Sequence, residues 1–107
     1  MGGDGKRVVL MTASGPEEAE RIARGLVEGK LAACVNIVPQ IRSVYQWEGK
    51  VCDDPETLLI AKTSVDKVAA LIEKVKCLHS YDVPEIISLG IEEGSEAYLA
   101  WMGDVLR

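Results

Sequence analysis

Residues 31–50, L-A-A-C-V-N-I-V-P-Q-I-R-S-V-Y-Q-W-E-G-K, decide the fold, because they predict one long strand followed by a tight turn. The run is rich in β-branched and aromatic residues, and its large side chains keep a single parity: Val35, Ile37, Ile41, Tyr45 and Trp47. Pro39 marks a break in the strand, and Glu48-Gly49-Lys50 offers the hairpin turn. Thr57–Thr63 then runs back as a second strand, which we expect to bulge at Asp53-Asp54-Pro55.

The segments around this hairpin complete a βαββαβ order with one further helix. Apolar runs and helical spacings predict five more elements: a strand at Arg7–Thr12, a helix opening at the capping-box pattern Ser14-Gly15-Pro16-Glu17, a helix capped by Ser64 and ending near Cys77, a strand at Glu85–Glu92, and a helix opening at Gly94-Ser95. Two βαβ-type crossovers that share a central hairpin describe an α+β fold of the ferredoxin-like type. We therefore expect a four-stranded antiparallel sheet with two packed helices and a C-terminal helix.

The composition is that of one globular domain. At 107 residues the chain fits a single hydrophobic core, and we place a loose N-terminus at residues 1–7 and one domain at residues 8–107. A formal net charge of -5 repels phosphate backbones and anionic lipids, so we expect neither nucleic acids nor membranes as partners. The three cysteines lack C-x-x-C spacing and the N-terminus lacks an apolar targeting region, which favours a cytoplasmic protein with reduced thiols.

The predicted hairpin is too long for the domain that carries it. A continuous strand of roughly 16 residues spans on the order of 50 Å, whereas a domain of this size has a diameter of about 35 Å. The overhanging part carries Tyr45, Trp47 and Val51, and exposed apolar strands aggregate unless another surface covers them. We therefore expect self-assembly. If Pro39 instead folds the strand back, the hairpin stays on its own sheet.

Five motifs carry a family resemblance: L-A-A-C-V-N-I at 31–37, S-V-Y-Q-W-E-G-K at 43–50, K-T at 62–63, Y-D-V-P-E-I-I at 81–87 and Y-L-A-W at 98–101. In this order they resemble the CutA divalent-cation tolerance family over nearly the whole chain. The resemblance implies a cytoplasmic ferredoxin-like homotrimer, associated with tolerance of copper and other divalent metals, whose long hairpins pair around the threefold axis. It also implies a metal or ligand site near the subunit interface, where His79-Ser80-Tyr81 stands in place of the family's His-Pro-Tyr. Met11 and Leu78 hold places where some members have a cysteine and a second histidine.

The candidate metal ligands are His79, Cys77 and Met11. Imidazole is a common ligand for zinc and copper, and in an extended segment Cys77 would point the same way as His79. Met11, at the end of the first predicted strand, offers a soft thioether suited to Cu(I). We expect copper or another divalent metal to bind weakly here, while a structural role for the lone histidine and a core role for Met11 stay open.

Five residues are candidates for a pocket or a contact between subunits: Tyr45, Trp47, Tyr81, Glu85 and Trp101. The sequence contains neither a phosphate-cradling glycine run nor an H-E-x-x-H helix, and its ionisable groups are not paired with a nucleophile, so we expect no catalysis. Divalent metal tolerance and binding, with copper foremost, is the function we favour. Two alternatives stay open: a regulatory binder of small molecules like the PII nitrogen-signalling proteins, which are also ferredoxin-like trimers, and a trimeric scaffold that anchors partners.

Overall fold

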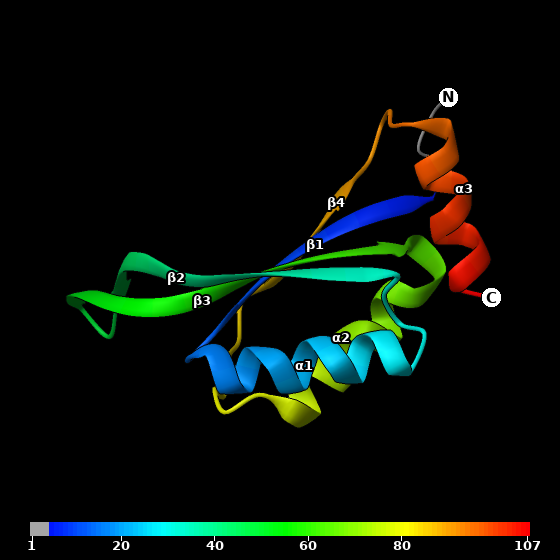
Figure 1. Cartoon of the computed structure of the whole chain (residues 1–107). Helices are drawn as coiled ribbons and strands as arrows, with labels where there is room; N and C mark the ends of the chain where they lie inside the picture. The colour runs from blue at the N-terminus through cyan, green and yellow to red at the C-terminus, as the bar shows by residue number, and fades with distance from the viewer. Residues whose placement is uncertain (1–4) are drawn as a thin grey trace.

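Figure 1 shows the computed structural model of the chain, which describes residues 5–107. Its elements follow the predicted order: β1 (Lys6–Ala13), α1 (Pro16–Glu28), β2 (Cys34–Trp47), β3 (Lys50–Ser64), the 3-10 turn η1 (Val65–Lys67), α2 (Val68–Leu78), β4 (Ile86–Gly90) and α3 (Glu96–Val105). The strands form one antiparallel sheet in the order β2-β3-β1-β4. The predicted α+β class is confirmed, and the strand order is that of the ferredoxin-like arrangement.

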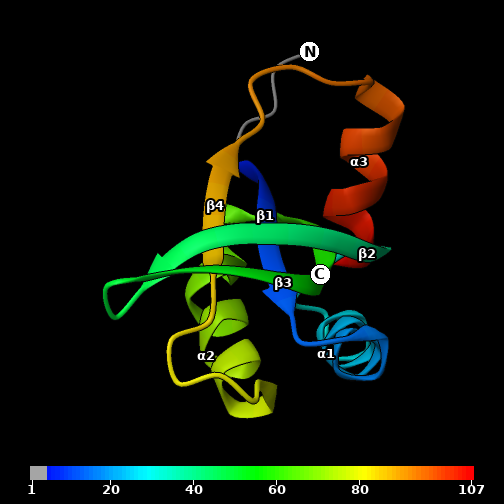
Figure 2. The same ribbon diagram turned by 90° about the vertical axis from the view of Figure 1, so that its left-hand side faces the viewer.

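The sheet carries helices on both of its faces. α1 and α2 lie together on one face, and α3 lies on the other (Figures 1 and 2). Alternate residues of β1 and β3 point towards α1 and α2, since successive side chains of a strand face opposite sides. They pack there with the apolar faces of the two helices in a fully buried core: Val9, Met11, Leu59, Ala61, Ile22, Leu26, Leu71 and Val75. Each Leu, Ile or Val of this kind contributes about 1.5–3 kcal/mol relative to an exposed side chain.

The start of the chain differs in detail from the prediction. β1 begins at Lys6, so residues 6 and 7 belong to the sheet and not to a loose N-terminus, while residues 1–4 lie outside the described residues. Gly15 occupies the N-cap of α1 without a side-chain hydrogen bond, so the capping box predicted at Ser14 does not form. Instead the Glu18 carboxylate reaches back and accepts a hydrogen bond from the Ser14 N–H at 2.9 Å.

The second helix extends further than predicted, and the last strand extends less far. The turn η1 precedes α2, so Ser64 does not cap the α-helix, which continues through Leu78. Cys77 therefore lies in the last turn of a helix. β4 is shorter than the predicted 85–92, because its pairing with β1 ends at the pair Arg7–Gly90. Among residues 5–107 no helix is both long enough and apolar enough to cross a membrane.

The strand irregularity lies on β2 at Pro39-Gln40, and the prediction of a bulge at residues 53–55 is wrong. Val38 pairs with Leu58 and Ile41 pairs with Glu56, so two residues of β2 oppose the single residue Thr57. Proline has no N–H to give to the ladder, which makes this position suited to a bulge. The Thr57 hydroxyl donates a hydrogen bond to the Pro39 carbonyl at 2.8 Å and so holds the irregularity in place.

The bulge also changes which face the hairpin side chains occupy. Ile37 pairs with the buried Leu59 and faces the helices. Tyr45 and Trp47 follow the bulge, and by the pairing register they share the opposite face with Glu56. The single parity predicted from Val35 to Trp47 is therefore wrong, because one inserted residue moves all later side chains to the other face.

Beyond the bulge, β2 and β3 leave the helices behind and continue as a two-stranded hairpin (Figure 1). Its turn places Glu48 and Gly49 at φ +50° and +78°, the left-handed backbone that a two-residue hairpin turn requires. The molecule measures 44 × 25 × 22 Å, with the hairpin along its length. The alternative in which Pro39 folds the strand back is wrong, because pairing with β3 resumes at Ile41 and continues to Trp47.

Candidate functional site

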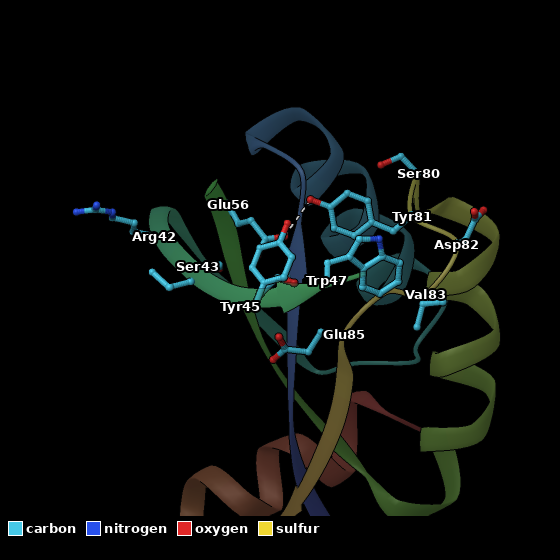
Figure 3. Close-up of a pocket in the computed structure, with 12 residues that line it drawn as sticks. Arg42, Ser43, Tyr45, Trp47, Glu56, Ser80, Tyr81, Asp82, Val83 and Glu85 are labelled. Atoms are coloured by element: carbon cyan, nitrogen blue, oxygen red, sulfur yellow. Dashed lines mark hydrogen bonds between the residues drawn. The ribbon is translucent and has the colours of Figure 1, made fainter. Parts of the chain in front are cut away.

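A groove of about 820 Å³ lies between the β2–β3 hairpin and the segment that connects α2 to β4 (Figure 3). We call it the hairpin groove. It is lined by Thr12, Arg42, Ser43, Val44, Tyr45, Trp47, Glu56, Ser80, Tyr81, Asp82, Val83 and Glu85. Four of the five residues predicted for a pocket or subunit contact are among them. The fifth, Trp101, lies on α3, where its ring packs against Tyr98 with 5.4 Å between the centroids.

The hairpin wall of the groove presents aromatic rings. Tyr45 and Trp47 point into the groove in Figure 3, and the Tyr45 hydroxyl donates a hydrogen bond to Asp54 at 2.7 Å. This bond raises the pKa of Tyr45, since the neutral phenol is the donor. Arg42 lies on the other face of the hairpin and forms two bonds to Asp53, at 2.8 and 2.7 Å. Its guanidinium points away from the rings in Figure 3.

The opposite wall is built around Tyr81. Its hydroxyl donates a hydrogen bond to the Glu56 carboxylate at 2.9 Å, which joins the connecting segment to β3. Burial, followed by this bond and the negative charge of Glu56, raises the pKa of Tyr81 to about 12. The Tyr81 ring also packs against the His79 ring, with 4.7 Å between the centroids. Tyr81 is therefore held at both its ring and its hydroxyl.

Glu18 on α1 anchors this wall to the core. Its carboxylate accepts the Ser80 N–H at 2.8 Å and the Ser14 N–H at 2.9 Å, and it lies 3.7 Å from His79 Nδ1. The side chain is only 5% exposed. Burial by itself raises the pKa of Glu18, but the hydrogen bonds from Ser14 and Ser80 outweigh it and lower the pKa to about 2. A buried carboxylate with these partners stays ionised and stabilises the loop that bears Tyr81.

Sequence reasoning missed Glu18, although the sequence contained a signal. Glu18, Ile22 and Leu26 recur at a spacing of four and therefore lie on one face of α1. An acidic residue on an otherwise apolar face needs a buried partner, because an unpaired charge is costly there. The partner, the backbone N–H of Ser80, could not be identified from a spacing within the helix.

His79 does not have a free nitrogen for a metal. Its Nε2 lies 2.8 Å from the Thr12 carbonyl, which can only accept, so Nε2 carries a proton. Its Nδ1 accepts the Tyr81 N–H at 3.0 Å. If Nδ1 carried a proton, that proton would face the Glu18 carboxylate. The Nδ1 lone pair would then be unavailable to a metal as well. With its side chain 0% exposed, His79 fits a structural role and does not fit a metal site.

The other two predicted ligands lie apart from this ring. Cys77 is exposed in the last turn of α2, where residues two apart do not share a face, so the extended segment assumed for Cys77 and His79 is wrong. Met11 is fully buried in the core beneath α1 and α2. Across residues 5–107, no three His, Cys, Asp or Glu side chains are grouped so that they could hold a metal ion.

Comparison with known proteins gives a consistent answer. Residues 7–105 match the model of the CutA1 divalent ion tolerance protein family. The chain is 57% identical over 88 residues to a CutA homolog of Xenopus laevis. The aligned region covers 82% of this chain but only 58% of the longer relative. It is 50% identical over 97 residues to the divalent-cation tolerance protein CutA of Thermus thermophilus, which covers 91% of this chain and 94% of the relative.

Solved structures agree with the sequence comparison. The fold superposes with a TM-score of 0.93 on a protein from Archaeoglobus fulgidus, at 42% identity, over 95% of this chain and 99% of that one. That protein is described as the periplasmic divalent cation tolerance protein CutA. With the match to residues 7–105 and the shared fold, the chain belongs to the CutA1 divalent ion tolerance family.

Proposed function

We propose that the chain works as a cytoplasmic homotrimer that contributes to divalent-cation tolerance by binding and not by catalysis. The observation that carries the proposal is the exposed apolar surface of the overhanging hairpin, where Val44 and Val51 are 65% and 76% exposed. A monomer rarely leaves such a two-stranded apolar extension uncovered, because it invites aggregation. A second copy of the chain supplies the cover.

A second uncovered surface favours a cyclic assembly. Ile87 and Leu89 of β4 are 49% and 50% exposed on the face of the sheet that turns away from α1 and α2. By the pairing register, Val44 and Val51 lie on the other face, so the two surfaces differ. When two different surfaces of one chain meet head to tail, the contacts close into a ring if the rotation permits. A threefold ring is the closure that the family resemblance implies.

Divalent cations enter the proposal as weakly bound ligands. The Thermus relative is named a divalent-cation tolerance protein, and we carry that role over to this chain. Copper is the metal that we expect to bind best, because affinity among divalent first-row metals peaks at copper for a given set of ligands. The ring of His79 has no part in this binding, since both of its nitrogens are engaged.

The cytoplasmic location rests on the three free thiols, which suit a reducing compartment. A PII-like binder of phosphorylated molecules is less well supported, since the guanidinium of Arg42 points away from the groove and is paired with Asp53. Acidic groove side chains such as Glu56 and Glu85 would repel a phosphate.

The tolerance role is tested by growth. Cells that lack their own copy of such a protein would be grown at rising copper, zinc and cadmium concentrations, with wild type, with Val51→Asp or with an empty vector. Wild type should restore growth and Val51→Asp, which should disrupt assembly, should not. Equal growth with wild type and the empty vector at every metal concentration would reject the tolerance role. Fractionation of the same cells, with the chain in the soluble cytoplasmic fraction as the expected result, tests the location.

A further inference from the structure

The hairpin groove combines aromatic rings with carboxylates. We propose that it binds a small organic cation, an alkylated ammonium group, between the rings of Tyr45, Trp47 and Tyr81 and beside the carboxylates of Glu56 and Glu85. This inference goes beyond the tolerance role, because such a ligand is neither a metal ion nor a subunit.

Aromatic rings line both walls of the groove. Tyr45 and Trp47 come from the hairpin and Tyr81 from the facing segment, so aromatic faces line the groove from two sides (Figure 3). Each ring carries negative charge density on its face and attracts a cation placed within about 6 Å of its centre. Aromatic rings offer no lone pair to a metal, but alkylated ammonium groups are recognised by sets of rings.

The charged side chains of the groove are mostly acidic. Glu56 and Glu85 both line the groove. Among the described lining residues, Arg42 is the basic one, and its guanidinium is held by Asp53 on the other side of the hairpin. The interior of the groove is therefore negative, which favours a cation and repels an anion.

The groove wall is fixed before a ligand arrives. The Glu18 carboxylate accepts the Ser80 N–H, and His79 Nδ1 accepts the Tyr81 N–H. The Tyr81 hydroxyl donates to the Glu56 carboxylate. This series of contacts runs from the buried face of α1 to the hairpin. A wall that is already ordered costs less entropy on binding than one that must be ordered by the ligand.

Assembly and ligand binding use different faces of the hairpin. Tyr45 and Trp47 point into the groove, whereas Val51, which carries the proposed subunit contact, lies on the other face by the pairing register and is not among the lining residues. The failure of one proposal therefore leaves the other testable, provided that the mass of each variant is measured alongside its binding.

Tetramethylammonium is the probe, and tert-butanol, a neutral molecule of similar shape, is its control. Each would be titrated into the assembled protein at constant ionic strength, by calorimetry and by tryptophan fluorescence. The fluorescence would be read in Trp101→Phe, so that Trp47 provides the signal. We expect saturable binding of tetramethylammonium with a change in Trp47 emission and no saturable binding of tert-butanol. Equal responses to the two probes, or a linear response to both, would overturn the proposal.

Two variants locate the site. Glu85→Gln should weaken tetramethylammonium binding about fivefold or more, while Glu92→Gln, which removes the same charge from an exposed position outside the groove lining, should leave the affinity unchanged. Trp47→Leu should reduce binding at least as much, with light scattering run on the same sample to show that the mass is unaltered. If Glu85→Gln and Glu92→Gln bind the probe equally, the groove is not the site and the inference is wrong.

Discussion

The Glu18 carboxylate and the Ser80 backbone N–H lie 2.8 Å apart, although 62 positions separate them in the chain. This contact ties the loop that carries Tyr81 to the first helix and so fixes one wall of the hairpin groove. A buried carboxylate that accepts two backbone N–H groups makes a large, pH-dependent contribution to stability.

We therefore expect Glu18→Gln to lower the free energy of unfolding at pH 7 by on the order of 2–3 kcal/mol, because the amide cannot accept both the Ser14 and Ser80 N–H groups as a carboxylate does. The folded pKa of Glu18, about 2, lies below its ordinary value of 4.5. Its stabilisation is therefore present above pH 4.5 and is lost as the pH falls towards 2.

Urea unfolding at equal chain concentrations from pH 2 to 7 measures this effect. The wild-type and Glu18→Gln curves should converge as the pH approaches 2. Glu17→Gln, at the neighbouring and exposed position of the same helix, is the matched control and should follow wild type throughout. A constant gap between wild type and Glu18→Gln across the whole pH range would contradict the role assigned to the carboxylate.

His79 should be important for stability and irrelevant to copper. His79→Ala leaves the Thr12 carbonyl without its donor and should cost about 2–3 kcal/mol, and His79→Gln, whose amide N–H₂ can donate to that carbonyl, should restore part of the loss. Copper titration by calorimetry at pH 7.5 should give the same isotherm for wild type and His79→Gln. A clear loss of copper binding in His79→Gln would show that the imidazole is a ligand after all.

Thr57 should control the opening of the hairpin. Thr57→Val removes the hydroxyl that donates to the Pro39 carbonyl and should cost about 1–2 kcal/mol, with faster hydrogen exchange at the amides of residues 41–47. Thr63→Val is the matched control, since its hydroxyl donates to the Leu31 carbonyl at 2.7 Å, at the far end of the same strand. It should lower stability without changing exchange in the hairpin. Equal exchange at residues 41–47 in both variants would refute the bulge's role.

Much of the fold could be predicted because local patterns specify it. Helical spacing located α1 and α2, and the Glu48-Gly49 turn with its flanking strands located the hairpin. Pro39 marked the break in β2, but the sequence did not show that the extra residue lies there and not at Asp53-Asp54-Pro55 on β3. That one residue decided the orientation of Tyr45 and Trp47.

The candidate site was predictable in its rings and not in its polar contacts. Tyr45, Trp47 and Tyr81 line one groove as large side chains from facing segments, whereas Trp101 belongs to a separate pair with Tyr98 on α3. The metal hypothesis required that Cys77 lie in an extended segment, and α2 extends one residue beyond it. The two nitrogens of His79 are bonded to backbone groups, the Thr12 carbonyl of β1 and the Tyr81 N–H. Backbone partners leave no signal in the sequence.

The subunit contact should depend on the face of the hairpin opposite the groove. Val51→Asp should reduce the assembly to monomers or raise its dissociation constant at least a hundredfold, because a charge would be buried there without a partner. Val65→Asp is the control, since Val65 is likewise an exposed valine, at 50% against 76% for Val51, but lies in η1 away from the hairpin. It should keep the wild-type mass. Loss of assembly in both variants would point to general destabilisation.

The most direct test of the central claim is the mass of the wild-type protein in solution, measured by size exclusion with multi-angle light scattering from micromolar to submicromolar concentration. Assembly through the hairpin predicts a single species of three times the 11.6 kDa chain mass that persists on dilution. A species with the mass of one chain at every concentration would contradict the account, since the hairpin with Val44 and Val51 would then stand uncovered in a stable, soluble monomer.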